Sequence, residues 1–217
     1  MRQVTALMLA LILIAALSTA FAKDASLRVT VSSRNDKTFL AGAKVTLLST
    51  NGEVLSRLTG SDGEATLNAA PGSYLVTVEF PAFRKEEFQD IHLTDGATES
   101  LSAGLQEYLP VSIVNLLAAP DRYDGRAVAV SGFVSLKFED EALYLHREDW
   151  QRGLTRNAVW LSMNSNLRST AKKFDRRYAT VKGVFSSVQS GHGGLFGGTV
   201  TVDTLETTIG EDRNQQN

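Results

Sequence analysis

The chain has 217 residues, of which 43% are hydrophobic and 21% charged, and its formal net charge is −2. This composition is typical of a globular protein and excludes a disordered chain, a collagen and a coiled coil. The near balance of charges excludes a basic arm or an acidic tail as the main functional feature. The absence of cysteine excludes disulfides, thiolate zinc sites and thiol catalysis.

Residues 1–22 have the pattern of a secretory signal peptide. Arg2 precedes an apolar run from Val4 to Leu17, and Ala20-Phe21-Ala22 is a small-x-small cleavage pattern. Because the run is shorter than the roughly 20 residues that span a bilayer as a helix, we expect cleavage after Ala22. The alternative is an uncleaved N-terminal anchor. No later stretch is apolar enough to span, so we expect a periplasmic or extracellular protein without a transmembrane segment after cleavage.

Residues 23–105 have the pattern of a small β-sandwich. Runs that alternate apolar and polar residues recur about every 10 residues with no helical stretch, which is typical of strands with one buried face. Turn-forming pairs such as Asn51-Gly52 and Asp62-Gly63 separate the runs. The seven predicted strands are residues 27–31, 43–47, 54–58, 65–67, 74–78, 88–93 and 98–105.

The turn residues of this region resemble those of the carboxypeptidase regulatory-like domains. The matching segments are Gly42-Ala43-Lys44-Val45, Thr59-Gly60-Ser61-Asp62-Gly63 and Pro71-Gly72-Ser73-Tyr74. The resemblance implies a transthyretin-like β-sandwich, which in such proteins is usually an appended module without catalysis. The sequence departs from the pattern at Ala82-Phe83, where these domains often have glycine before the aromatic residue.

Residues 106–210 predict a second domain, a five-stranded OB-like barrel, after a boundary near residues 104–110. The predicted elements are a helix at 112–118, strands at 126–138, 142–146, 158–163, 177–188 and 199–205, a turn at 139–141, a helical turn at 148–152 and a helix at 164–174. A helix between the third and fourth strands is the order of an OB-fold. Gly132 and Gly183 fall inside long strands, where a small barrel needs bulges or bends. We expect residues 211–217 to form a disordered tail, and the whole chain to be all-β with minor helix.

This second region also resembles an uncharacterised group of OB-like bacterial proteins. The matching segments are residues 120–126, 130–133, 142–145, 153–161 and 191–197. The resemblance implies an OB-like barrel and no established activity.

The sequence offers no catalytic constellation. His92, His146 and His192 are far apart, and no zinc, calcium-loop or nucleophile-elbow motif is present. We therefore predict no catalytic residues, no metal and no cofactor, and treat a histidine-based hydrolase that uses His146 or His192 as the weakest alternative.

Two features of the barrel predict a ligand surface. If Leu143 and Leu145 point inward, Tyr144 and His146 point outward, and Trp160 does so on the next strand, with Trp150 nearby. Such rings stack on sugars or bases when they are exposed. The alternative is that the sandwich or the helix at 112–118 covers them.

The glycine-rich run at residues 191–198 would follow the fourth strand, where OB barrels bind ligands, and would present His192. The alternative is a glycine hairpin without a ligand. The predicted ligand-binding residues are therefore Tyr144, His146, Trp150, Trp160 and His192.

Charge argues against nucleic acid as the partner. Residues 147–182 carry an excess of basic side chains that could contact phosphates, but Glu139-Asp140-Glu141 lies where an OB domain usually grips a strand. We therefore expect an exported, non-enzymatic binding or assembly module of the bacterial envelope that recognises a protein or glycan. Binding of an oligosaccharide on the OB face is the alternative.

Overall fold

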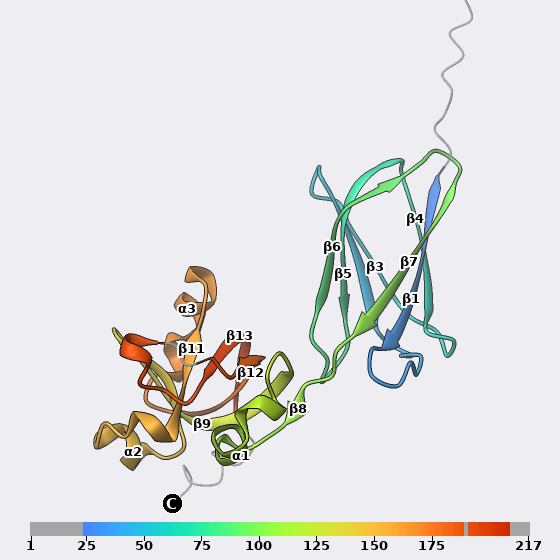
Figure 1. Ribbon diagram of the computed structural model, residues 1–217. Coiled ribbons are helices and arrows are strands. Elements are labelled where there is room, and N and C mark those ends of the chain that lie inside the picture. The colour runs from blue at the N-terminus through green and yellow to red at the C-terminus, as the bar shows by residue number, and fades with distance from the viewer. Residues whose placement is uncertain (1–23, 189–190, 209–217) are drawn as a thin grey trace, which may run out of the picture.

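The computed structural model describes residues 24–188 and 191–208, and within this part all of the side chains except that of His192. The protein is mostly strand, with minor helix, and Figure 1 shows a β-sandwich beside a ring-like β-barrel. The strands of the sandwich are β1 (Ala25–Ser33), β2 (Lys44–Ser49), β3 (Val54–Leu58), β4 (Glu64–Ala69), β5 (Gly72–Glu79), β6 (Glu86–Leu93) and β7 (Thr98–Leu105). All seven strands predicted for this region are therefore confirmed.

In the second half of the chain, the described residues form six strands and three short helices. They are β8 (Leu109–Pro110), α1 (Ile113–Ala118), β9 (Ala127–Lys137), β10 (Asp140–Tyr144), α2 (Arg147–Gln151), β11 (Ala158–Ser162), α3 (Ser165–Ala171), β12 (Tyr178–Ser186) and β13 (Thr199–Thr207). Short 3-10 turns lie at Pro120–Arg122, Thr155–Asn157, Lys172–Phe174 and His192–Gly194.

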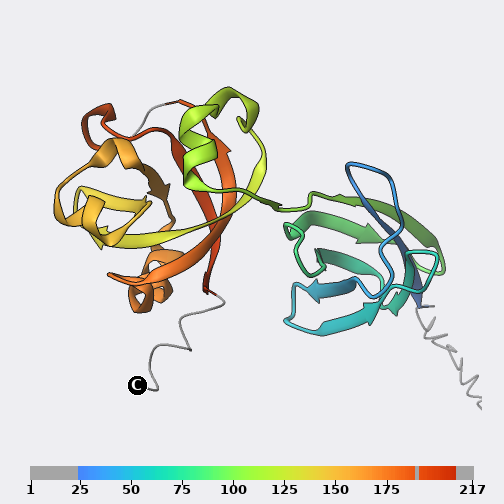
Figure 2. The ribbon, with the colours of Figure 1, turned by 90° about the horizontal axis from the view of Figure 1, so that it is seen from below.

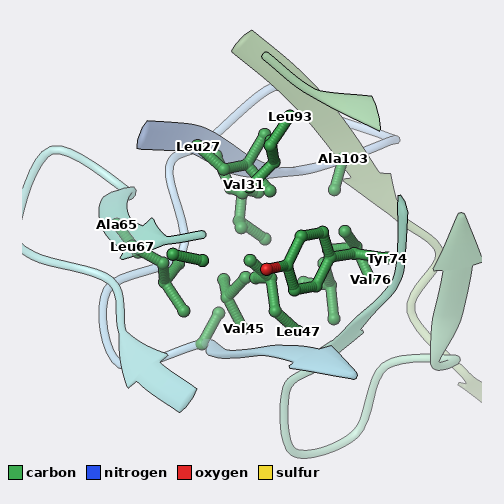
Figure 3. Close-up of a cluster of buried hydrophobic side chains, with 14 of the residues drawn as sticks. Leu27, Val31, Val45, Leu47, Ala65, Leu67, Tyr74, Val76, Leu93 and Ala103 are labelled. Carbon is green, nitrogen blue, oxygen red and sulfur yellow. The ribbon is translucent and has the colours of Figure 1, made fainter. Parts of the chain in front are cut away.

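The sandwich packs two sheets face to face. One has the strand order β4-β1-β7 and the other β3-β2-β5-β6. In β1, alternate residues such as Leu27, Val29 and Val31 are buried, as their period-2 spacing predicts. Figure 3 shows Leu27 and Val31 on the same core as Val45 and Leu47 of the facing sheet.

A glycine shapes the turn between β3 and β4. Gly63 has a φ of +72°, a conformation that side chains disfavour. A Cβ atom at this position would lie 2.6 Å from the carbonyl oxygen of Val31. The Asp62-Gly63 pair therefore supplies both the backbone angle and the space that this turn needs.

The barrel is a closed ring of five strands. β9 pairs with β10, β10 with β11, β11 with β13, β13 with β12, and β12 with β9 again; only the β11–β13 pair is parallel. The helix α3 lies between the third and fourth strands of the ring, so the predicted five-stranded barrel and the place of its helix are confirmed, and its assignment as OB-like stays a prediction. The helices α1 and α3 pack at opposite ends of the barrel (Figure 1 and Figure 2).

The two glycines inside the barrel strands mark close approaches between neighbouring strands. The register between β12 and β13 shifts at Lys182/Gly183, and a Cβ atom on Gly183 would lie 2.2 Å from the carbonyl oxygen of Thr201. This is the bulge that the sequence predicted at Gly183. At Gly132, a Cβ atom would lie 2.5 Å from the carbonyl oxygen of Tyr144, so this position also needs glycine.

Two details of the predicted barrel were wrong. The turn between the first two strands is at residues 138–139 and not at 139–141, because Asp140 and Glu141 already pair with β9. The short strand β8, which runs parallel to the start of β9, was not predicted. A strand of only two residues is too short to show any alternation.

The predicted signal peptide and the predicted tail at 211–217 lie outside the described residues. Within the described part, no helix is long and apolar enough to cross a membrane. The bounds of the two domains given above stay predictions.

Candidate functional site

The sandwich and the barrel meet at a joint formed by backbone pairing. The loop between β5 and β6 runs beside the segment that leads into the barrel, residues 106–108. Arg84 N–H donates to the carbonyl oxygen of Gln106 at 2.8 Å, and Tyr108 N–H donates to that of Ala82 at 2.9 Å. Ala82 has a φ of +66°, a backbone conformation that glycine adopts more readily than alanine. The joint is therefore ordered on its sandwich side.

A polar cluster attaches this joint to the barrel. The Arg84 guanidinium holds both carboxylate oxygens of Asp203 on β13, with distances of 2.9 Å from Nε to Oδ2 and 3.2 Å from Nη2 to Oδ1. The Tyr108 hydroxyl donates to the same carboxylate at 3.0 Å. A two-pronged arginine–carboxylate contact fixes orientation as well as distance. The three side chains therefore set how the sandwich and the barrel are oriented.

The cluster changes the protonation equilibria of two of its members. The hydrogen bond that Arg84 donates to Asp203 raises the pKa of Arg84, which keeps this side chain charged. Burial raises the pKa of Tyr108 far above its usual range, and the nearby Asp203 charge acts in the same direction. Tyr108 is only 7% exposed, so its phenol stays neutral and donates its proton.

A groove of about 1010 Å³ lies at this joint and is lined from both sides. The sandwich contributes the loop at residues 80–85 and the start of β6, and the barrel contributes β12, β13 and the first turns of α3. A smaller depression of about 370 Å³ continues from it across the sandwich loop. Phe80 and Phe83, with ring centroids 5.5 Å apart, line both hollows.

Most charged side chains of the groove are paired. Lys85 lies 2.7 Å from Glu87, and Lys182 lies 2.7 Å from Glu206 while its Nζ sits 5.9 Å above the Tyr108 ring. These exposed pairs contribute little stability and exchange readily with other charged groups. The groove therefore combines an aromatic shelf with charged side chains of both signs.

The predicted aromatic surface of the barrel is a second hydrophobic cluster. Leu143 points into the barrel and Tyr144 out of it, as the alternation predicted. Tyr144 is only 2% exposed, because Phe133, Trp150 and Phe196 pack around it and around Trp160. The residues that cover it belong to α2 (Trp150) and to the glycine-rich loop (Phe196), whereas the alternative proposed the sandwich or the helix at 112–118.

Asp140 lies at the polar edge of this cluster. It accepts hydrogen bonds from the hydroxyls of Ser135 at 2.8 Å and Tyr144 at 2.5 Å, and from the Trp150 indole at 3.1 Å. Burial, followed by the hydrogen bond to Asp140, raises the pKa of Tyr144 far above its usual range. The carboxylate therefore satisfies three donors that the cluster would otherwise leave unpaired.

The structure describes the side chain of one of the two histidines predicted as ligand residues. His146 is exposed and is the N-cap of α2, where its backbone N–H donates to the Asp149 carboxylate at 3.1 Å. The side chain of His192 lies outside the described residues, although its backbone begins a 3-10 turn. The loop that carries it packs on the cluster: a Cβ atom at Gly191 would lie 2.5 Å from the Trp160 ring.

One part of the predicted surface remains open. A hollow of about 270 Å³ is lined by Trp160, Phe138, Arg168, Glu139 and Glu141. Phe138 is 86% exposed at the tip of the β9–β10 hairpin, and Arg168 donates to Glu141 at 2.6 Å. The ligand-binding role of Tyr144, His146, Trp150, Trp160 and His192 stays a prediction.

Sequence reasoning missed the residues of the joint. Arg84, Tyr108 and Asp203 are far apart in the chain and belong to no motif. The only local signal was the departure at Ala82-Phe83, which marks the loop that forms the joint. Among the described residues, no three His, Asp or Glu side chains lie close enough together to hold a metal ion.

One comparison with known protein families covers the sandwich. Residues 26–106 match the carboxypeptidase regulatory-like domain, in agreement with the resemblance of the turn residues in this region. No curated protein matches the chain.

Among solved structures, the chain is similar to the TIE protein of Bacillus anthracis, with 17% identity over 39% of this chain and 16% of that one and a TM-score of 0.32. It is also similar to a putative carbohydrate binding protein from Bacteroides uniformis, with 15% identity over 40% of this chain and 43% of that one and a TM-score of 0.34. It is similar as well to a C-terminal fragment of the pilus adhesin SpaC from Lactobacillus rhamnosus GG, with 18% identity over 41% of this chain and 47% of that one and a TM-score of 0.33. The chain thus spans less than half the length of each of these structures.

Proposed function

We propose that this chain is an exported, non-enzymatic binding or assembly module of the bacterial envelope, and that it binds a protein partner in the groove between the sandwich and the barrel. The observation that carries the proposal is the groove itself. It lies between the sandwich and the barrel, where the Arg84–Asp203–Tyr108 cluster connects the two.

The chemistry of the groove favours a protein as the partner. Aromatic and arginine side chains contribute most of the binding energy in protein interfaces, and Phe80, Phe83 and Arg84 provide both kinds here. The surrounding charged pairs can exchange partners with charged groups of either sign on a second protein. A binding role needs no reactive centre, in agreement with the absence of a catalytic motif in the sequence.

The experiment is a binding screen with a matched pair of variants. Purified envelope proteins and a glycan array are probed with the wild-type chain, with Lys85→Ala in the groove, and with Lys172→Ala on the exposed 3-10 turn after α3. We expect a protein ligand whose binding weakens in Lys85→Ala and stays unchanged in Lys172→Ala. Equal binding by both variants, or binding to glycans alone, would contradict the proposal.

A second candidate function rests on the hollow beside Trp160. An aromatic ring next to an arginine–glutamate pair is suited to stack on a sugar ring and to bond its hydroxyl groups. This candidate is the binding of an oligosaccharide on the barrel. Tryptophan fluorescence during titration with the glycans of the array tests it: loss of the response in Phe138→Ala supports the site, and binding that persists in Phe138→Ala excludes it.

A further inference from the structure

The strand β3 is an open edge of the sandwich. It ends the four-stranded sheet, and β2 is the one strand that pairs with it in the described part of the chain. Val54 is 59% exposed and Leu58 is 61% exposed, so two of its five side chains present apolar surface to solvent. Such an edge is a template for pairing with a further strand.

The hydrogen bonds at the two ends of β3 show which backbone groups are free. Ser49 N–H donates to the carbonyl oxygen of Glu53, and Thr59 N–H donates to that of Ala43, both at 2.9 Å. In an antiparallel ladder, residue pairs that share backbone hydrogen bonds alternate with pairs that do not. Counting from Glu53 to Thr59, the residues of β3 whose backbone groups bond to β2 are therefore Leu55 and Arg57. The other three residues, Val54, Ser56 and Leu58, point their N–H and C=O groups away from β2.

The opposite edge of the same sheet is protected, and β3 is not. In β6 the register shifts opposite Tyr74 and Val76, Asp90 has a φ of +55°, and the strand carries several carboxylates. These features are those that block edge pairing. The register of β3 with β2 is unbroken, and its one charged residue, Arg57, turns to β4 and donates to the carbonyl oxygen of Thr66 at 2.9 Å.

We propose that this edge binds a second copy of the chain, with the two β3 strands antiparallel and centred on Ser56. In this register Ser56 faces Ser56 of the second copy, and Val54 faces Leu58. All three residues then exchange both backbone hydrogen bonds with the second copy, because these are the residues whose groups point outward. A two-fold arrangement of this kind uses the same surface on both copies and closes on itself.

The side chains fit this register. Val54 lies opposite Leu48 on β2, and Leu48 is itself exposed, so the contact of Val54 with Leu58 of the second copy continues an apolar row across both sheets. Glu53 would face Thr59, and Arg57 would face Leu55. No like charges therefore meet across the interface.

The pairing surface is separate from the groove. The groove is lined by residues at the β6 side of the sheet, and β3 is the strand at its other edge. Self-association can therefore fail or succeed independently of the proposed partner binding.

The absence of cysteine from the chain allows a direct test of the register. In the proposed dimer, the two Ser56 Cα atoms are about 5.5 Å apart, within the range that a disulfide bridges. The two Val54 Cα atoms are four strand positions apart, about 13 Å, which is too far. We expect the full chain with Ser56→Cys to form a disulfide-linked dimer under mild oxidation, and Val54→Cys to remain uncrosslinked. Equal crosslinking of both variants, or none in Ser56→Cys, would overturn the proposal.

Sedimentation equilibrium gives a second measurement with a matched control. Val54→Lys places a charge on the open edge, and Val114→Lys makes the same change at a 52% exposed valine on α1. We expect the wild-type chain and Val114→Lys to dimerise alike, and Val54→Lys to dimerise at least about tenfold more weakly. A monomeric wild-type chain, or equal weakening by both substitutions, would refute the second copy as the occupant of this edge. Circular dichroism checks that each variant is folded.

Discussion

Replacing Asp203 by alanine should release the barrel from the sandwich while leaving both folded. The substitution removes the acceptor of three hydrogen bonds, two from Arg84 and one from Tyr108. The Arg84 side chain is 43% exposed, so solvent screens its ion pair with Asp203. The loss of this pair should therefore cost only about 1 kcal/mol. The buried Tyr108 hydroxyl would lose its acceptor, which adds about 1–2 kcal/mol. A total of about 2–3 kcal/mol would change the ratio of docked to undocked molecules by a factor of roughly 30 to 150.

Residual dipolar couplings of the backbone amides measure this effect. In the wild-type chain we expect the sandwich and the barrel to share one alignment tensor, because they move as one body. In Asp203→Ala we expect two different tensors, with the amide shifts inside each sheet unchanged. Glu64→Ala, which removes the exposed Arg28–Glu64 pair of the sandwich, is the control and should keep a common tensor. A common tensor in Asp203→Ala would refute the idea that this cluster sets the orientation.

Three further predictions concern stability. Asp140→Ala should lower the free energy of unfolding by about 3 kcal/mol, measured with urea, because buried donors on Ser135 and Tyr144 lose their acceptor; a loss below about 1 kcal/mol would contradict this role. Ala82→Gly should raise the melting temperature by a few degrees, since glycine relieves a positive φ that costs alanine about 1 kcal/mol; an unchanged or lower value would show that the turn is not strained. Tyr108 and Tyr144 have raised pKa values in the folded state, so the stability that depends on their neutral forms is complete below about pH 10 and is lost as the pH rises above it. Tyr144→Phe should therefore reduce the loss of stability at alkaline pH, measured by urea unfolding at a series of pH values. An identical pH profile in this variant would count against the burial argument.

The strands could be predicted from the sequence because each follows a local rule. Alternation in residues such as Leu27, Val29 and Val31 gives one buried face, and Asp62-Gly63 supplies a turn whose geometry only glycine accepts without strain. A glycine inside a long strand likewise predicted the bulge at Gly183 in the barrel. These signals lie within a few residues of the structure that they determine.

The site could not be predicted in the same way. Arg84 and Asp203 are separated by 119 residues and meet only because the loop between β5 and β6 reaches β13. Alternation gave the correct side of the barrel wall for Tyr144, but it could not show that α2 and the glycine-rich loop would cover that side. Local patterns indicate which way a side chain points, whereas burial depends on which distant segment packs on it.

The account depends most on the groove between the sandwich and the barrel being the surface that meets a partner. A photocrosslinking amino acid placed at Lys85, inside the groove, and at Lys172, outside it, tests this in living cells of the native host. The account predicts one protein adduct from position 85 and none of the same mass from position 172. No adduct at position 85, or the same adduct from both positions, would contradict it.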